Sequence, residues 1–446
     1  MLQNYAELLV DGHRVLPRLL HDIRRAQESI HVSVFLFFRD PIGEEIAAAL
    51  VERARAGVKV RVLLNVEKTG MGDPFSTGEK RMMQHDPNIE HNPLDVKPLC
   101  ERLEEAGASV KDTNIDYDLV IPTRDTRLQS VAAQVREGIA IDELHIDHRK
   151  LVVIDGCVAY TGGANFGAQY LHHVAFDPKV DARDEGESRK KQGLSEPWWK
   201  WHDSLTRFAG PVVPAIEKHF RERWILDGGD EYEPITAAEG SPLFRDAPAP
   251  DTAIASAEVF SNEPNEKPNT VRELYVRLIA NATSSIFIEN PYLYHPDIVE
   301  ALLAAKRARA ELRVVLVVPS GKHNDNAFSQ DAQEHHYASY LEAGIEVYEY
   351  QNHFNHLKLA IFDERWSIHG STNLNFRSLE NDKDFELVVL VDDRELARRA
   401  LEDVRDVDIV HSRRIDASDV SGTSLAAIRK RTRDPRTLLL MSRRVL

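Results

Sequence analysis

The segment His148-Arg-Lys-Leu-Val-Val-Ile-Asp155 has a counterpart in the second half of the chain, His356-Leu-Lys-Leu-Ala-Ile-Phe-Asp363. Each segment places a Lys two residues after the His and an Asp at the same distance beyond it. A turn of small residues follows each segment and ends in an Asn, 17 residues after the His in both copies: Asn165 and Asn373. Two matches with identical internal spacing are hard to obtain by chance. The chain therefore carries a duplication with a symmetric set of His, Lys and Asn.

The duplication extends beyond the two motifs. Each half contains three matching segments in the same order: a helix end that leads into a strand, then a helix, then a second strand. They lie at about Ala26–Phe37, Gly43–Ala56 and Val58–Leu64 in the first half, and at about Ala282–Tyr292, Asp297–Ala308 and Leu312–Val318 in the second. Strands that alternate with helices predict an α/β sandwich in each half. We therefore expect an α/β fold of two tandem sandwich halves with pseudo-twofold symmetry, whose motifs face each other across one shared active site.

Composition shifts suggest where the halves begin and end. We expect a first domain over 1–227, a linker rich in Gly, Pro and acid over 228–254, a second domain over 255–412 and a basic tail over 413–446. The first domain is the longer one. Its extra length lies mostly in two polar insertions, at about 68–99 and 111–142, and another polar stretch at about 172–197 follows the first motif. We expect these three segments to rim the site.

The chain of 446 residues has the composition of a water-exposed globular protein, with 42% hydrophobic and 29% charged residues. Its two cysteines predict neither a disulfide framework nor a metal site. No apolar run approaches the roughly 20 residues of a membrane-spanning helix, and the first residues lack the layout of a signal peptide. These features predict a cytoplasmic protein.

The net charge of −16 argues against tight binding along a nucleic-acid backbone. The charge is unevenly distributed, because the tail over 413–446 carries +6 and the remaining residues carry −22. This tail mixes basic and apolar residues, which predicts peripheral contact with an anionic membrane at the inner face of the cell membrane. A solvated or packed C-terminal helix is the alternative.

The motif residues suit attack on a phosphodiester. Side chains two apart on a strand point to the same face, which directs His148 with Lys150, and His356 with Lys358, toward a common site. Two Lys charges and the amides of Asn165 and Asn373 can bind the substrate's non-bridging oxygens. One His can attack phosphorus and form a phosphohistidine, while the other protonates the leaving alkoxide and later deprotonates the incoming alcohol or water. This chemistry requires no metal and no other cofactor.

Each His also needs a carboxylate to orient its other ring nitrogen. The candidates are acids downstream of each motif in the same half, Asp203 for His148 and Glu386 for His356. Asp155 and Asp363 complete the motifs, but they stand before turns at strand ends, and we interpret them as structural.

Several aromatic and histidine residues near the motifs are ambiguous. The run Trp198-Trp199-Lys-Trp201 is either a lipid anchor or packing before Asp203, and packing is favoured. Tyr292 and Tyr294 follow a strand end and either line the pocket or pack. His145 with His148 could suggest a metal cluster, but a polar approach to the motif strand is the favoured interpretation.

The paired motifs, Arg377-Ser378, Asp384-Phe-Glu386 and Asn290-Pro-Tyr292 resemble the phospholipase D superfamily, and within it the bacterial cardiolipin synthases. The resemblance covers about 8–227 and 255–412. It implies two phospholipase D-like domains and a phosphatidyltransferase that joins phosphatidylglycerol-like phospholipids through a phosphohistidine. It also implies that His148 is the nucleophile and His356 the acid and base, with the reverse assignment left open.

One departure from the family is visible in the sequence, since many cardiolipin synthases begin with two membrane-spanning segments that this chain does not show. Three other functions remain open. A phospholipase D hydrolase would release phosphatidic acid from the same intermediate, a nuclease or other phosphodiesterase would use the same site behind a basic groove, and a binding protein would keep the fold without turnover.

Overall fold

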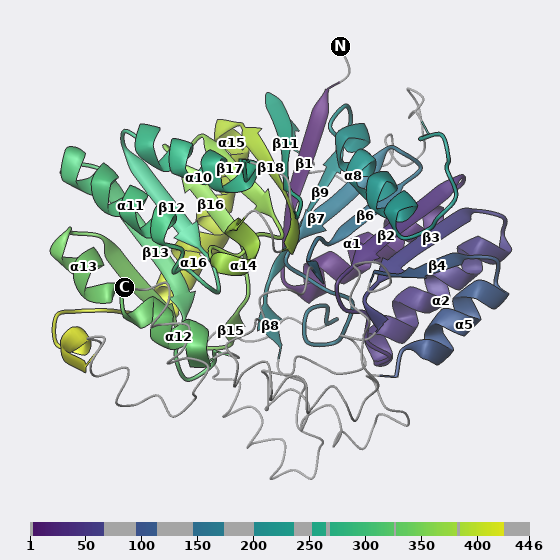
Figure 1. Cartoon of the computed structure of the whole chain (residues 1–446), viewed down its shortest axis with the longest axis horizontal. Helices are drawn as coiled ribbons and strands as arrows, with labels where there is room; N and C mark the ends of the chain where they lie inside the picture. Colours follow the sequence, from purple (N-terminus) through teal and green to yellow (C-terminus); the bar gives the residue numbers. More distant parts are fainter. Residues whose placement is uncertain are drawn as a thin grey trace, which may run out of the picture.

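The computed structural model describes residues 3–66, 95–113, 146–173, 200–235, 252–264, 268–324, 327–380 and 384–422. The molecule consists of two large sheets, one from each half of the chain, that meet in its middle (Figure 1). Helices α2 and α5 lie on the outer side of the first sheet, and α11 and α13 lie on the outer side of the second (Figure 1). Their bounds follow below.

The first sheet has eight strands in the order β10-β1-β9-β7-β6-β2-β3-β4. Strands β2, β3 and β4 are parallel, and β6 joins β2 in the antiparallel sense. The strands are β1 (Asn4–Val10), β2 (Ser29–Val34), β3 (Lys59–Leu64), β4 (Ser109–Asp112), β6 (Leu151–Ile154), β7 (Val158–Gly162), β9 (Ser204–Ala209) and β10 (Thr252–Ile254). The helices of this half are α1 (Gly12–Arg25), α2 (Pro41–Arg55), α5 (Lys97–Glu105) and α8 (Val213–Leu226).

The second sheet has the order β11-β18-β17-β16-β12-β13-β14-β19, in which the strands from β11 to β14 repeat the order from β1 to β4 and the added edge strand lies beside β14 instead of beside β1. The strands are β11 (Ser256–Asn262), β12 (Ser285–Glu289), β13 (Arg313–Pro319), β14 (Glu346–Tyr350), β16 (Leu359–Phe362), β17 (Trp366–Gly370), β18 (Asp384–Asp392) and β19 (Ser412–Arg414). The helices are α10 (Thr270–Asn281), α11 (Pro296–Ala308), α12 (Ala327–Glu334), α13 (Tyr337–Glu342), α14 (Phe376–Leu379), α15 (Arg394–Ala400) and α16 (Asp406–Val410), with a π-helical turn at Leu401–Arg405 and a 3-10 turn at Asp419–Gly422. The predicted fold class, two tandem α/β halves, is confirmed.

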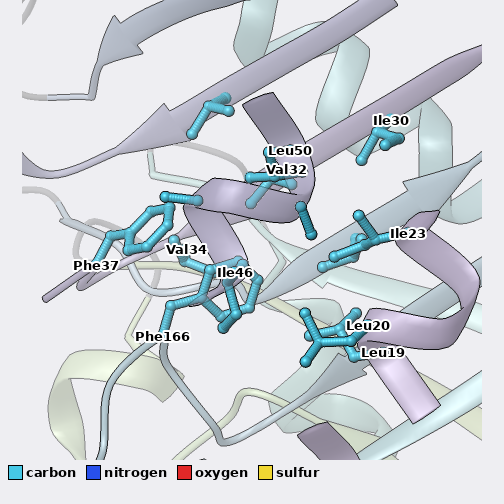
Figure 2. Packing of buried hydrophobic residues seen from close by; sticks show 14 of the residues in the cluster. Leu19, Leu20, Ile23, Ile30, Val32, Val34, Phe37, Ile46, Leu50 and Phe166 are labelled. Carbon is cyan, nitrogen blue, oxygen red and sulfur yellow. The ribbon is translucent and has the colours of Figure 1, made fainter. Parts of the chain in front are cut away.

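The outer core of the first half shows why these segments fold as they do. Helix α1 buries an apolar stripe at helical spacing that includes Leu16, Leu19 and Ile23, and this stripe packs on β2 and α2 (Figure 2). Asp40 caps the N-terminus of helix α2, where its carboxylate accepts hydrogen bonds from the amides of Ile42 and Gly43. Because this stripe is buried against β2, one face of β2 must point toward α1 and α2.

The opposite faces of the two sheets form a core that both halves share. One buried cluster joins Leu151, Val153 and Phe208 of the first sheet to Leu387 and Val389 of the second. Alternate residues of β6 therefore face opposite cores, as strand geometry requires. Both motif strands, β6 and β16, consequently lie in the buried middle of their sheets, which fixes the position of the residues before them.

Two predicted boundaries differ from the described structure. The last residues of the linker predicted at 228–254 form β10, which pairs with β1, and the tail predicted at 413–446 begins inside β19, which pairs with β14. Residues 423–446 and most of the three predicted insertions lie outside the described residues. Within the described part of the chain, no helix is both long and apolar enough to cross a membrane.

Candidate active site

Two very short strand pairs connect the halves and assemble the site. Strand β5 (Ile146–Asp147) runs parallel to the start of β18, and β15 (Phe354–Asn355) runs parallel to β8 (Trp201–His202). The amide of His148 donates to the carbonyl of Phe385 (3.0 Å), and the amide of His356 donates to the carbonyl of His202 (2.8 Å). Strands β8 and β15 lie together between the two halves in Figure 1. Each motif His is thus held opposite the residue that precedes an acid of the other half.

Each motif His is paired with an acid from the other half. Nδ1 of His148 lies 2.9 Å from Oε1 of Glu386, and Nδ1 of His356 lies 2.7 Å from Oδ2 of Asp203. We predicted both acids, but the pairing within each half, Asp203 with His148 and Glu386 with His356, was wrong. The cause is the register of the two cross-strand pairs, which brings each His beside the strand that carries the acid of the opposite half.

The two motif lysines are nearly fully buried beside the histidines. Nζ of Lys150 donates to the carbonyl of His148 (2.6 Å), and Nζ of Lys358 donates to the carbonyl of His356 (2.7 Å). Burial lowers the pKa of His148, and the charges of Lys150 and Lys358 act in the same direction. Burial likewise lowers the pKa of Lys150 to about 7. Since the Lys of one half acts on the His of the other, the two motifs form one electrostatic site.

The side chains of the two motif asparagines have different surroundings. Oδ1 of Asn165 accepts a hydrogen bond from the amide of Leu36 (3.1 Å). The amide of Asn373 donates to Oγ of Ser378 (3.3 Å), and its buried Oδ1 has no hydrogen-bond partner among the described residues. The side chain of Asn165 therefore helps to hold its own turn, whereas that of Asn373 retains an acceptor for another group.

The motif aspartates stand at the far ends of β6 and β16 and do not contact the histidines. The carboxylate of Asp155 accepts the amides of Gln27, Glu28 and Ser29 at 2.8 Å each. The carboxylate of Asp363 accepts the amides and hydroxyls that open β12 in the same way. Both residues have positive φ, near 50°. Their geometry agrees with the structural interpretation of these two acids, because each fastens the end of a motif strand to the start of its neighbour.

The two orienting acids are held in different ways. Glu386 accepts hydrogen bonds from the hydroxyls of Ser371 and Ser378, the second at 2.5 Å. Gly163 occupies the position in the first motif that Ser371 occupies in the second, and a Cβ there would lie 2.2 Å from Oδ1 of Asp203. Asp203 instead accepts the amide of Ser204 (2.7 Å). The missing side chain at 163 therefore makes room for the shorter acid. Sequence analysis missed the contacts of both serines with Glu386, although Arg377-Ser378 had been noted.

This difference in contacts produces a difference in ionisation. Burial raises the pKa of Glu386, but His148, Lys150 and Ser371 together bring it below its ordinary value. Burial raises the pKa of Asp203 to about 7, against the opposing charge of Lys358. Burial also lowers the pKa of His356 well below its usual range. At neutral pH, Glu386 is a carboxylate that accepts the Nδ1 proton of His148, while Asp203 and His356 form a pair that can hold one additional proton.

Among the described residues, three aromatic rings lie around His356, whereas Phe35, at 5.7 Å, lies beside His148. The rings of Trp201, Phe354 and Tyr170 lie 5.0, 5.7 and 5.7 Å from the ring of His356. Trp201 is buried, so the packing interpretation holds for this residue, while Trp198 and Trp199 lie outside the described residues. The interpretation of Tyr292 as a pocket residue stays a prediction.

A second group of titratable residues lies directly behind Asp203. Nδ1 of His202 is 2.9 Å from Asp11, and its Nε2 is 3.0 Å from Asp408 and 3.8 Å from Glu289. The ligand atoms of His202, Glu289 and Asp408 lie close enough to hold a metal ion, as do those of an outer group made by His219, Glu222 and Glu263. Nothing in the sequence predicts the His202 group, because its members are far apart along the chain.

Comparisons with known proteins agree with this geometry. A family model described as "Cardiolipin synthase, PLD-like domain" matches residues 19–175 and 275–406, more than half of the chain. The major cardiolipin synthase ClsA of Bacillus subtilis (strain 168) is 26% identical over 414 residues, which span 92% of this chain and 70% of that protein. Cardiolipin synthase 2 of Bacillus anthracis is 25% identical over 437 residues, which span 94% and 70%.

A solved structure covers nearly the whole molecule. The phosphatidylserine synthase of Haemophilus influenzae Rd KW20 matches with a TM-score of 0.62 over 99% of this chain and 94% of that chain, at 13% identity. At this identity the likeness concerns the fold alone. The superfamily resemblance inferred from the paired motifs is confirmed.

Proposed function

Because the chain belongs to the cardiolipin synthase family of phospholipase D-like domains, we propose that it is a phosphatidyltransferase that joins two phospholipids through a covalent phosphohistidine. At the coarser level it is a phospholipase D-type enzyme that modifies phospholipids. The observation that carries the finer proposal is the crossed pair of His–acid contacts, His148 with Glu386 and His356 with Asp203, flanked by two buried lysines. This arrangement supplies one nucleophile, one proton carrier and two cations to one phosphodiester.

His148 is the proposed nucleophile. Its Nδ1 proton is held by ionised Glu386, so Nε2 carries the lone pair that attacks phosphorus. The attack forms an N–P bond and breaks the bond from phosphorus to the leaving head-group oxygen. Lys150 and Lys358 stabilise the charge that builds on the non-bridging oxygens, in a buried setting where such charge interactions are strong. The side-chain NH₂ group of Asn373 is proposed to donate to one of these oxygens.

His356 is the proposed acid and base. It passes a proton to the departing alkoxide, then removes the proton of the incoming alcohol, whose oxygen attacks the phosphohistidine and releases His148. Asp203 supports this role because its raised pKa lets the pair store and return one proton near neutral pH. Glu386, with its lowered pKa, is less suited to proton storage, which favours His148 over His356 as nucleophile.

The proposed substrates are phosphatidylglycerol-like lipids, which the enzyme would reach by peripheral contact with an anionic membrane, with the basic tail as one contact. Water competes with alcohol for the same phosphohistidine, so hydrolysis to phosphatidic acid is the second candidate. The net charge of −16 disfavours nucleic acid as substrate.

The test uses purified enzyme with phosphatidylglycerol vesicles in EDTA, and lipid mass spectrometry of the products. Cardiolipin and glycerol, absent with His148→Ala, are expected. A matched control is His369→Gln, which removes a buried imidazole that is bonded to Thr206 and Ser367 rather than to any residue of the site. Wild-type enzyme quenched with detergent at alkaline pH, where the N–P bond of a phosphohistidine persists, should also retain a labelled phosphatidyl group. Phosphatidic acid alone would make the enzyme a hydrolase, and turnover that stops in EDTA would contradict the metal-free mechanism.

A further inference from the structure

The buried imidazole of His202 lies between carboxylates from both halves of the molecule. Asp11 at the start of α1 faces Nδ1 at 2.9 Å, and Asp408 of α16 faces Nε2 at 3.0 Å. The ring also stacks on Tyr350, with centroids 5.1 Å apart. A neutral imidazole has only one N–H, so two hydrogen bonds to ionised carboxylates require the doubly protonated, cationic form. The two carboxylates accordingly raise the pKa of His202 well above its ordinary value, although burial opposes them.

Glu289 completes this group. Its Oε1 accepts a hydrogen bond from Nδ2 of Asn355 (2.6 Å), whereas its buried Oε2 has no hydrogen-bond partner among the described residues. Burial and the neighbouring Asp408 raise the pKa of Glu289 well above its usual range. A proton on Oε2 gives this atom a hydrogen to donate toward Asp408. The group then places one cation between two carboxylates and holds a further proton on Glu289.

Asp11 connects this group to the catalytic pair. Its Oδ1 accepts from His202 (2.9 Å) and from the amide of Asp203 (3.3 Å), and its own amide donates to the carbonyl of Asp203 (2.8 Å). Asp11 does this in a backbone conformation, φ 62° and ψ 156°, that non-glycine residues rarely adopt. Such strain persists only where surrounding contacts enforce it, and it is concentrated at functional sites.

We infer that Asp11 and Asp408 hold His202 as a buried imidazolium, and that this cation and Asp11 together position Asp203 against Nδ1 of His356. His202, Asp11 and Asp408 are positioning residues that act through Asp203. The role of His356 as acid and base rests on the proposed function, whereas the charge state of His202 does not. We call Asp11, His202 and Asp408 the clamp. Because Asp408 comes from the second half, the geometry of the Asp203–His356 pair also depends on how the two halves pack.

The equivalent position in the other half has no such group. Phe385 precedes Glu386 as His202 precedes Asp203, and its ring packs under the guanidinium groups of Arg149 and Arg223 at 4.9 and 4.7 Å. Glu386 takes its support from Ser371 and Ser378 instead. The imidazolium is therefore specific to the Asp203–His356 pair, where it favours the ionised form of Asp203.

The experiment compares wild type with His202→Gln, Asp408→Asn and the His369→Gln control in steady-state kinetics with phosphatidylglycerol vesicles. Removing the cation should lower kcat at least about tenfold, part of the roughly 10²–10⁴-fold that acid–base catalysis contributes, with KM little changed. The basic limb of the pH profile should also move to higher pH, because Asp203 loses a neighbouring cation and keeps its proton longer. The charged and titratable groups that face Asp203 are Asp11, His202, His356, Lys150 and Lys358, and only His202 among them is replaced.

A second measurement keeps the inference testable if a variant fails to fold. Selective ¹⁵N labelling of histidine in wild-type protein should show His202 still protonated on both nitrogens at neutral pH, above the ordinary pKa of an imidazole. A neutral His202, a stoichiometric bound metal, or a pH profile that does not move in either variant would overturn the inference. If no lipid is turned over, the proposed function fails, and the ¹⁵N spectra still decide the charge of His202.

Discussion

The two His–acid pairs share the same backbone arrangement, but different contacts hold their acids in place. A two-residue strand before each His pairs with the strand that leads into the acid of the other half. Glu386 is long and is held by two hydroxyls, while Asp203 is short, lies against Gly163 and is backed by His202. The scaffold is therefore symmetric and the electrostatics are not. One duplicated site can in this way supply a nucleophile from one half and a proton carrier from the other.

The sharpest test of that division compares His148→Ala with His356→Ala. Each should lower turnover of phosphatidylglycerol by at least about 10⁴-fold, because the residues of one mechanism act as a unit. With a phosphodiester that has a 4-nitrophenol leaving group, release needs no acid. His356→Ala should then recover a burst of nitrophenol, while His148→Ala should not. A burst from His148→Ala alone would reverse the assignment of the two histidines.

Substitutions at the equivalent positions 163 and 371 test whether the two acids are held in different ways. Gly163→Ser should cost about 100-fold in kcat, because the new Cβ displaces Asp203 and misplacement near 1 Å has effects of this size. Ser371→Ala removes one of two hydroxyls from Glu386 and should cost about tenfold, equal to about 1.5 kcal/mol for a hydrogen bond to a charged group. Equal losses in the two variants would mean that the acids are held in equivalent ways.

The charge state of Lys150 can be tested by the pH dependence of kcat/KM, where we expect a smaller effect. Lys150 must be protonated to bind a phosphodiester, and burial lowers its pKa to about 7. It is therefore charged below that pH and neutral above it, so kcat/KM should fall as the pH rises through 7, by up to about tenfold per unit. In Lys150→Arg the guanidinium stays charged, and this part of the limb should disappear from the residual activity. Lys358→Arg is the matched control and should retain it.

The motif aspartates should affect stability rather than catalysis. Asp155→Ala leaves three amides, the one of Ser29 buried, without their acceptor and should lower the free energy of unfolding by about 1–3 kcal/mol in urea titrations. Asp363→Ala should cost less, because its site is more exposed. Since its amide partners keep the pKa of Asp363 low despite burial, its contribution is present above a pH of about 4 and is lost as the pH falls further. A large loss of kcat in either variant would contradict the structural role.

The sequence was sufficient to predict what depends on local pattern and repetition. The motif spacing and the alternation of helices and strands predicted two similar halves, and the identity of both orienting acids followed from their position after each motif. The pairing of those acids did not follow, because it depends on two-residue strands such as β5 that have no periodicity of their own and pair across the whole chain. The clamp of Asp11, His202 and Asp408 was missed for the same reason, since only the fold brings these residues together.

The crossed pairs have a consequence for how such a chain can arise. Either half alone would contain a motif histidine without the acid that orients it, so a product of one half would need a second copy beside it to complete a site. Joining the two halves in one chain replaces an encounter between molecules with an effective concentration that the linker fixes, independent of how much protein a cell makes. It also allows each half to change separately. The two halves accordingly differ in the contacts of their acids, with serines around Glu386 and a buried imidazole behind Asp203.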